Sequence, residues 1–261
     1  EDVEQPIHRV TVSRPFYLGM HEVTQKQFQA VTGNNPSEFR SPDFPVDRVS
    51  HDDALSFIRR LARLPEEEKH DRVYRLPSEA EWEFACRGGT QTKFFFGDDP
   101  EQLVRYAWVL ENSDGQTKDV GKLLPNAFGL FDVHGNVNEH CSDLFDPGYY
   151  RVSPQHDPFG RFFIDTEDES SGHRVIRGSA ADDSGDNVNS GARYHLDSSQ
   201  PTGSDDGILV GIRVVAEVIP ELPVFLRQVR TLNGHKKTVR SLVFSEDGRS
   251  LVSGSADGTA K

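Results

Sequence analysis

Three helix-starting signals lie before Gly89, and no helical period is sustained after that glycine. In each signal a Ser or Thr is followed three residues later by Gln, Asp or Glu, a spacing that lets each side chain bond the other residue's backbone N–H group. After Gly89, residues of the types Gly, Pro, Asp, Asn and Ser separate short apolar runs, as in loops and short strands. We therefore expect three short helices in the first part of the domain and a loop-rich, mainly strand second part.

The signals place the helices along the chain. The pairs are Thr24 with Gln27, Ser50 with Asp53, and Ser78 with Glu81. The first predicts a helix over Gln25–Val31 that stops at Gly33, and the third predicts one that Gly88 ends. The second predicts a helix with one apolar face, made of Ala54, Phe57, Ile58, Leu61 and Leu64.

Two segments predict strands of the same domain. Ile7–Tyr17 alternates apolar and polar residues, which indicates a strand that runs into a loop. Val210–Val218 is rich in Val and Ile and predicts a single closing strand.

The charge balance limits the partners of the chain. Lys and Arg number 29 against 42 Asp and Glu, which gives a formal net charge of −13. Because nucleic acids and anionic membranes repel such a surface, we expect neither as a partner. Cations or basic peptides suit the charge better. No apolar stretch approaches the roughly 18 residues that a membrane span requires.

Two cysteines, Cys86 and Cys141, are too few for a disulfide framework, so packing or a bound ion must supply stability. This usage favours a cytoplasmic location. The chain starts at Glu1 and stops inside an apparent repeat, so we expect both ends to be truncated and draw nothing from a missing signal peptide.

The last thirty residues differ from the rest. Residues 232–261 resemble the start of a WD repeat: Gly234-His235 precedes two strand-like segments, each followed by a turn that contains Asp-Gly. Residues 219–231, with Pro220 and Pro223, are predicted to be a linker. A full blade needs about 40 residues, so we expect an incomplete β-propeller blade that continues in a longer protein.

Residues 1–218 resemble the formylglycine-generating enzyme family, also called sulfatase-modifying factors. The ordered segments that carry the resemblance are Pro15–Gly19, Glu22–Gln25, Arg75–Glu83, Gly135–Val137 with Glu139, Arg174-Val175 with Arg177-Gly178, and Ala192-Arg193. The closing motif Gly-Phe-Arg of the family is replaced here by Gly211–Arg213, which has Ile in the middle. The resemblance implies a C-type-lectin-like α+β fold with little regular secondary structure, as the loop-rich second half also suggests.

The resemblance also implies a calcium site. Family members bind calcium through the segment that reads here Asp132–Glu139. Carried over by position, the ligands are the side chains of Asp132 and Glu139 and the carbonyl groups of Gly135 and Val137. A hard cation of this kind takes several oxygens at about 2.3–2.6 Å. The alternative is that Asp132 only caps a turn and that Glu139 is simply exposed.

The family's copper chemistry is not expected here. Active members hold copper with two cysteines and use oxygen to convert a substrate cysteine to formylglycine, but residues 178–189, where these cysteines would lie, contain none. The two positions fall near Asp183 and Val188, and neither side chain replaces a thiolate toward Cu(I). A His140–Cys141 nucleophile is disfavoured because neighbours in an extended strand point to opposite faces.

Arg177, Asp183 and Arg193 are candidate ligand-binding residues, although loop anchoring is the simpler role of the two arginines. We therefore expect a non-catalytic, calcium-stabilised module that binds a peptide or protein within a larger WD-repeat protein. The alternatives are an oxidoreductase of the family that makes formylglycine and an inert structural relic.

Overall fold

The computed structural model of the 261-residue chain describes residues 3–70, 72–159, 172–197, 208–218, 239–244 and 251–255. The chain divides into two compact units, Glu1–Ile219 and Pro220–Lys261. In the second unit, β8 (Val239–Phe244) pairs antiparallel with β9 (Leu251–Ser255). The expected linker at 219–231 and the expected turns of the blade lie outside the described residues.

The three predicted helices are confirmed. They are α1 (Gln25–Thr32), α2 (His51–Leu61) and α3 (Glu79–Arg87), and each begins with a complete capping box. Gly33 and Gly88 follow α1 and α3 with φ of 79° and 55°, a left-handed conformation that costs glycine little. On α2 the predicted face is buried at Ala54, Phe57 and Ile58, whereas Leu64 lies beyond the end of the helix.

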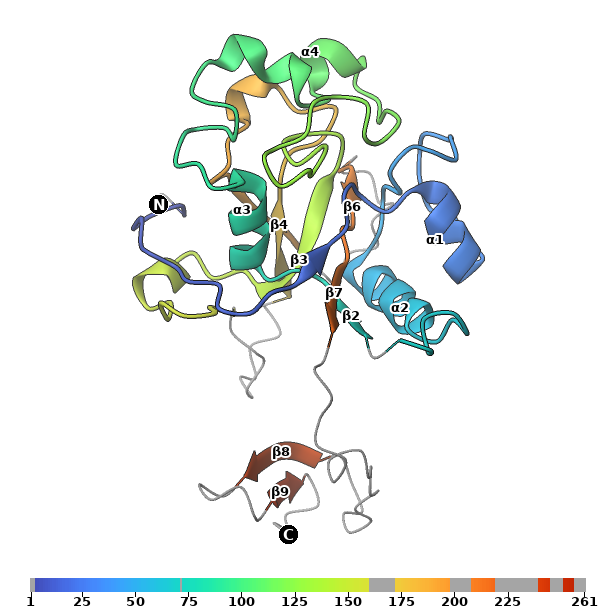
Figure 1. Ribbon diagram of the computed structural model, residues 1–261, viewed down its shortest axis with the longest axis vertical. Coiled ribbons are helices and arrows are strands. Elements are labelled where there is room, and N and C mark those ends of the chain that lie inside the picture. The colour runs from blue at the N-terminus through green and yellow to red at the C-terminus, as the bar shows by residue number, and fades with distance from the viewer. Residues whose placement is uncertain are drawn as a thin grey trace. The chain divides into compact units, whose positions relative to one another are not determined.

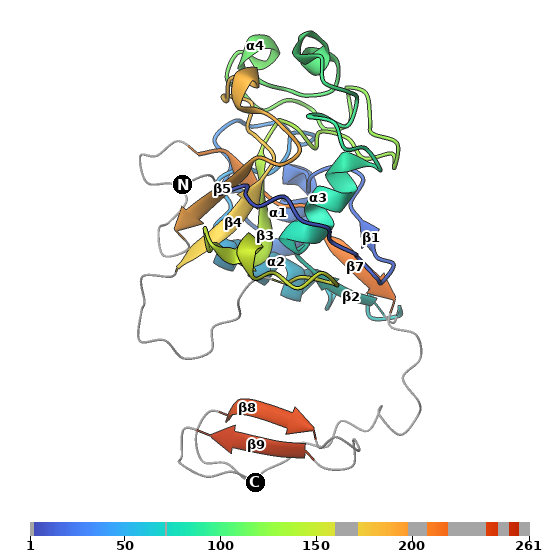
Figure 2. The ribbon, with the colours of Figure 1, turned by 90° about the vertical axis from the view of Figure 1, so that its left-hand side faces the viewer.

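Two small sheets form the centre of the first unit (Figure 1). The four-stranded sheet has the order β5-β4-β3-β6, in which β3 (Asn138–Leu144), β4 (His173–Arg177) and β5 (Arg193–Asp197) pair antiparallel and lie side by side in Figure 2. The other sheet is antiparallel in the order β1-β7-β2, formed by β1 (Tyr17–Leu18), β7 (Val215–Val218) and β2 (Arg72–Arg75).

The prediction of one closing strand over Val210–Val218 is wrong. The segment splits into β6 (Val210–Gly211), which pairs parallel with β3, and β7, which is the middle strand of the other sheet. Only glycine fits at position 211, because a Cβ atom there would lie 2.4 Å from the carbonyl oxygen of Val46, in the segment before α2. Residues 212–214 therefore carry the chain from one sheet to the other.

The predicted N-terminal strand is also much shorter than Ile7–Tyr17. Only β1 at Tyr17–Leu18 belongs to a sheet, and Thr11 forms an isolated bridge with His156. Beyond Gly89 the described helices are short: α4 (Leu110–Ser113) and 3₁₀ turns at Pro100–Arg105, Tyr149–Arg151 and Gly185–Asn187. The expectation of a loop-rich second half is confirmed.

Strand β3 separates two environments, because successive side chains of a strand point to opposite faces. On one face Cys141 lies in an apolar cluster with Trp82 and Ala85 of α3. On the other face His140 donates from Nε2 to the carbonyl oxygen of Val49 at 2.7 Å and packs edge-on against His51, the first residue of α2. Figure 1 shows α3 and α2 on opposite sides of this strand.

Candidate functional site

The loop that precedes β3 is fixed by close backbone contacts. Asp132 and Asn136 adopt left-handed φ values of 60° and 70°, and a Cβ atom at Gly135 would lie 2.2 Å from the carbonyl oxygen of Trp108. The Asn136 backbone N–H bonds that same oxygen at 2.8 Å, and its side chain bonds both backbone groups of Lys118. The loop that the sequence singled out is therefore rigidly placed.

Glu139 is fully engaged by protein groups. Its carboxylate accepts hydrogen bonds from Trp82 Nε1 at 2.7 Å and from Arg213 Nη2 at 2.7 Å and Nε at 2.9 Å. Both Glu139 and Arg213 are buried. The sequence reasoning noted Gly211–Arg213 as a motif but missed that its arginine is the partner of Glu139.

Two further carboxylates are buried beside this pair. Asp132 accepts the Gly121 N–H at 2.6 Å through Oδ2, but its buried Oδ1 has no partner among the described residues. Both oxygens of Glu22, a residue with no exposed surface, likewise lack a partner there. Burial, followed by repulsion from Asp132, raises the pKa of Glu22 well above its usual value, and burial also raises the pKa of Asp132.

Three carboxylates therefore face one guanidinium, that of Arg213. We call Glu22, Asp132, Glu139 and Arg213 the Arg213 centre. An excess of buried negative charge with unpartnered oxygens suits a hard cation. In the described part of the chain no three His, Cys, Asp or Glu side chains converge on one point, so calcium at this loop would depend on backbone carbonyls as well. Of the two carbonyls suggested by the resemblance, that of Gly135 already accepts the Val137 N–H at 3.0 Å.

A second group of buried charges lies on the α3 face of β4 and β5. Arg193 forms a bidentate contact with Glu79, in which Nε and Nη2 lie 2.6 Å and 3.0 Å from the two carboxylate oxygens. Its guanidinium group also lies over the ring of Tyr150. Arg177 bonds Glu83 and lies over the ring of Trp82. We call Arg177, Arg193, Glu79 and Glu83 the α3 centre. Both predicted ligand-binding arginines are thus buried and held by carboxylates.

The stretch 178–189 has no thiol at the positions singled out from the sequence. Asp183 accepts the Ala180 N–H at 2.7 Å, while its carbonyl oxygen accepts the Leu110 N–H, so it closes a turn. Val188 is buried in an apolar cluster with Phe94, Leu103, Ala107 and Val109.

Both cysteines are buried thiols away from this stretch. Burial raises the pKa of Cys86 to about 12 and also raises that of Cys141, so neither is a thiolate at neutral pH. His140 and Cys141 lie on opposite faces of β3, as expected.

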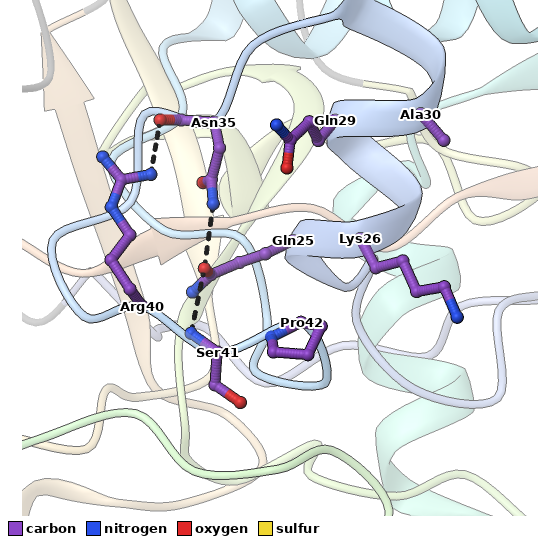
Figure 3. A pocket seen from close by; sticks show the side chains of 8 residues that line it. All are labelled: Gln25, Lys26, Gln29, Ala30, Asn35, Arg40, Ser41 and Pro42. Carbon is purple, nitrogen blue, oxygen red and sulfur yellow. Dashed lines mark hydrogen bonds between the residues drawn. The ribbon is translucent and has the colours of Figure 1, made fainter.

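An open pocket lies beside α1 (Figure 3). Its volume is about 510 Å³, and its lining consists of Gln25, Lys26, Gln29, Ala30, Asn35, Arg40, Ser41 and Pro42. The buried Gln25 side chain holds the wall, since its Oε1 accepts from Asn35 Nδ2 at 2.9 Å and from the Ser41 N–H at 3.3 Å. Arg40 Nη1 donates to the Asn35 carbonyl at 2.7 Å. Sequence reasoning missed this pocket, because the wall opposite α1 is a loop without regular structure.

Known proteins share both the sequence pattern and the fold. The sulfatase-modifying factor enzyme 1-like domain matches residues 1–218, and a WD domain, G-beta repeat, matches residues 226–261. The formylglycine-generating enzyme of Streptomyces coelicolor is 37% identical over 131 residues, and the chaperone protein LppX of Paenibacillus barcinonensis is 32% identical over 178 residues. These matches cover 46% and 51% of this chain and 38% and 63% of the relatives, so the chain spans less than two thirds of either relative.

Solved structures agree with the sequence matches. Treponema denticola variable protein 1 superposes with a TM-score of 0.66 at 29% identity, covering 80% of this chain and 86% of that one. PvdO from Pseudomonas aeruginosa superposes with a TM-score of 0.67 at 25% identity, covering 83% and 86%. The expected α+β fold, like that of formylglycine-generating enzymes, is confirmed, whereas the incomplete propeller blade stays a prediction. No helix among the described residues is long and apolar enough to cross a membrane. Residues 1–218 thus place the chain in the sulfatase-modifying factor enzyme 1-like domain family, and residues 226–261 carry a WD repeat.

Proposed function

We propose that this domain is a non-catalytic, calcium-stabilised module that binds a peptide or protein segment within a larger WD-repeat protein. The observation that carries the proposal is the stretch 178–189, which contains no cysteine and in which Asp183 closes a turn and Val188 is buried in an apolar cluster. A copper site of the family type needs two thiolates there, and the chain's two thiols are buried elsewhere.

Calcium is proposed for the Arg213 centre and the loop before β3. Asp132 would supply a carboxylate oxygen, and Gly135 and Val137 would supply carbonyl oxygens. Glu139 would supply a further carboxylate oxygen in exchange for one of its hydrogen bonds to Trp82 or Arg213. Support comes from the unpartnered Asp132 Oδ1 and from the excess of carboxylates over arginine at this centre. Such a cation would stabilise the fold without taking part in chemistry.

The calcium test uses Asp132→Ala, because Glu139→Ala would also remove the carboxylate that is hydrogen-bonded to the buried Arg213. In wild type, calcium at ~100 times its Kd should raise the free energy of unfolding by about 2.7 kcal/mol relative to chelator. In Asp132→Ala the difference between calcium and chelator should vanish. The matched control is Asp119→Ala, whose side chain is 41% exposed and should leave the calcium effect intact.

Two outcomes would contradict a calcium site at the Arg213 centre. One is an identical unfolding midpoint of the wild type in calcium and in chelator. The other is an undiminished calcium effect in Asp132→Ala, which would place the ion elsewhere.

The proposed ligand is a peptide or protein segment, and the pocket beside α1 is the candidate docking surface. Its volume lies within the range of about 300–1,000 Å³ common for ligand pockets, and its lining includes the charged residues Lys26 and Arg40. Peptides selected from a random library against the wild type should lose binding to Arg40→Glu. Peptides that bind both proteins equally would place the ligand on another face.

The second candidate function is formylglycine production, favoured by the 37% identity to a formylglycine-generating enzyme. Mass spectrometry of a Cys-x-Pro-x-Arg peptide, incubated with the protein, Cu(I), a thiol reductant and oxygen, decides between the two. We expect no conversion while a control enzyme converts the peptide. Conversion would overturn the non-catalytic proposal.

A further inference from the structure

Two histidines lie side by side on β4 and β5, at one edge of the four-stranded sheet. In the antiparallel pairing of β4 with β5, His173 lies opposite Asp197 and Val175 lies opposite His195. Directly paired residues, and residues two apart on one strand, share a face of the sheet. His173 and His195 are therefore diagonal neighbours on one face, with His195 exposed and His173 half-buried.

The two imidazole rings are close enough to share an ion. Nδ1 of His173 lies 3.1 Å from Nδ1 of His195, and the rings are nearly perpendicular, with an interplanar angle of 83°. Two nitrogens that bind Zn²⁺ at about 2.0–2.1 Å, at an angle near the tetrahedral one, are themselves roughly 3.3 Å apart. The spacing thus matches that of two adjacent ligands on one metal ion.

We propose that His173 and His195 form a two-nitrogen chelate for a divalent transition-metal ion of the zinc, copper or nickel class. Each ring would bind through Nδ1 and keep its proton on Nε2. Water would complete the coordination, because no third His, Cys, Asp or Glu side chain in the described part converges with the pair. Imidazole nitrogen selects these metals over calcium, so this site is chemically separate from the Arg213 centre.

The surroundings hold the pair in place. The ring of Phe145 lies 4.3 Å from that of His195, centroid to centroid, and the Phe145 backbone N–H bonds the His173 carbonyl at 2.9 Å. Arg193, whose charge acts on His195, is held in a bidentate contact with Glu79. Burial, together with His173 and Arg193, lowers the pKa of His195, which keeps that ring in the neutral form that a metal requires.

The test is Zn²⁺ titration of the full chain by calorimetry, in buffer without chelating groups. We expect saturable binding in wild type and a loss of roughly a hundredfold in affinity in His173→Ala and in His195→Gln, since each leaves a single ligand. His70→Ala removes an exposed histidine outside the sheet and should bind Zn²⁺ as wild type does. Binding should also weaken from pH 7 to pH 5, because protonation of imidazole competes with the metal.

A spectroscopic measurement on the wild type makes the result independent of how well the variants fold. Cu²⁺ bound at one equivalent should show electron paramagnetic resonance signals from two equatorial imidazole nitrogens. Signals from one nitrogen or none, or unchanged Zn²⁺ affinity in both variants, would overturn the proposal and leave the pair as a hydrogen bond between a donor and an acceptor nitrogen.

Discussion

The α3 centre and the Arg213 centre are built from the same parts in different proportions. In the α3 centre two arginines face two glutamates, and both carboxylates are bonded to guanidinium groups. In the Arg213 centre one arginine faces three carboxylates, and three buried oxygens lack a partner among the described residues. In the α3 centre the positive and negative charges of the side chains balance. In the Arg213 centre protons or a bound cation are needed to balance the excess negative charge.

The largest loss of stability should come from removing one carboxylate from the α3 centre. Glu79→Gln would leave Arg193 buried without its carboxylate, which costs about 3–5 kcal/mol for a buried pair. Urea unfolding in chelator should report this loss of stability. A cost below that of an exposed change such as Glu66→Gln would show that the α3 centre does not hold the fold together.

The second largest effect is the loss of stability at acid pH. We expect it to come from the buried histidines, which belong to neither centre. Burial lowers the pKa of His51 to about 3, so the folded state leaves it neutral while the unfolded chain protonates it below about pH 6.5. The unfolded state then binds more protons, and stability falls as the pH drops. We expect His51 to account for a loss of about 2 kcal/mol between pH 7 and pH 5.

His51→Gln provides the control for this prediction. The variant should have lower stability at pH 7, where His51 packs against His140, but a flatter decline toward pH 5. Parallel curves for the variant and wild type would assign the acid sensitivity to other groups, such as His134 and His140. Burial lowers the pKa of His134 to about 3 and that of His140 to about 4, so both are also protonated first in the unfolded chain.

The smallest predicted effect is a gain of stability rather than a loss. Glu22→Gln keeps the size of this side chain in the Arg213 centre and replaces its buried carboxyl group, whose pKa is raised by burial, with a neutral amide. In chelator we expect the free energy of unfolding to rise by about 1 kcal/mol, because an unpaired buried carboxylate is lost. A loss as large as that of Glu79→Gln would mean that the charges of the two centres are equally balanced, and the comparison between them would fail.

Local patterns in the sequence predicted local structure well. Each capping box joins residues three apart, so Thr24, Ser50 and Ser78 could be recognised without knowledge of the fold. The same holds for the opposite orientations of His140 and Cys141, which need only an extended strand.

Contacts between distant segments could not be predicted in this way. The bond between Glu139 and Arg213 spans 74 positions, and the His173–His195 pair depends on the register of two strands. The sequence signals for Glu22 and Arg213 were their places in the motifs Glu22–Gln25 and Gly211–Arg213, which marked the residues without giving their roles. The splitting of Val210–Val218 was missed because a run of apolar residues does not reveal which sheet each part joins.

That split segment has a consequence for the order of events during synthesis. Strands β1 and β2 contact only β7 within their sheet, and Arg213 just before β7 carries the positive charge of its centre. A ribosome therefore releases Glu22, Asp132 and Glu139 long before their counter-charge has been made. The domain should therefore fold only after β7 has left the ribosome. A chain truncated before residue 210 should be degraded by proteases and should not form a shorter stable domain.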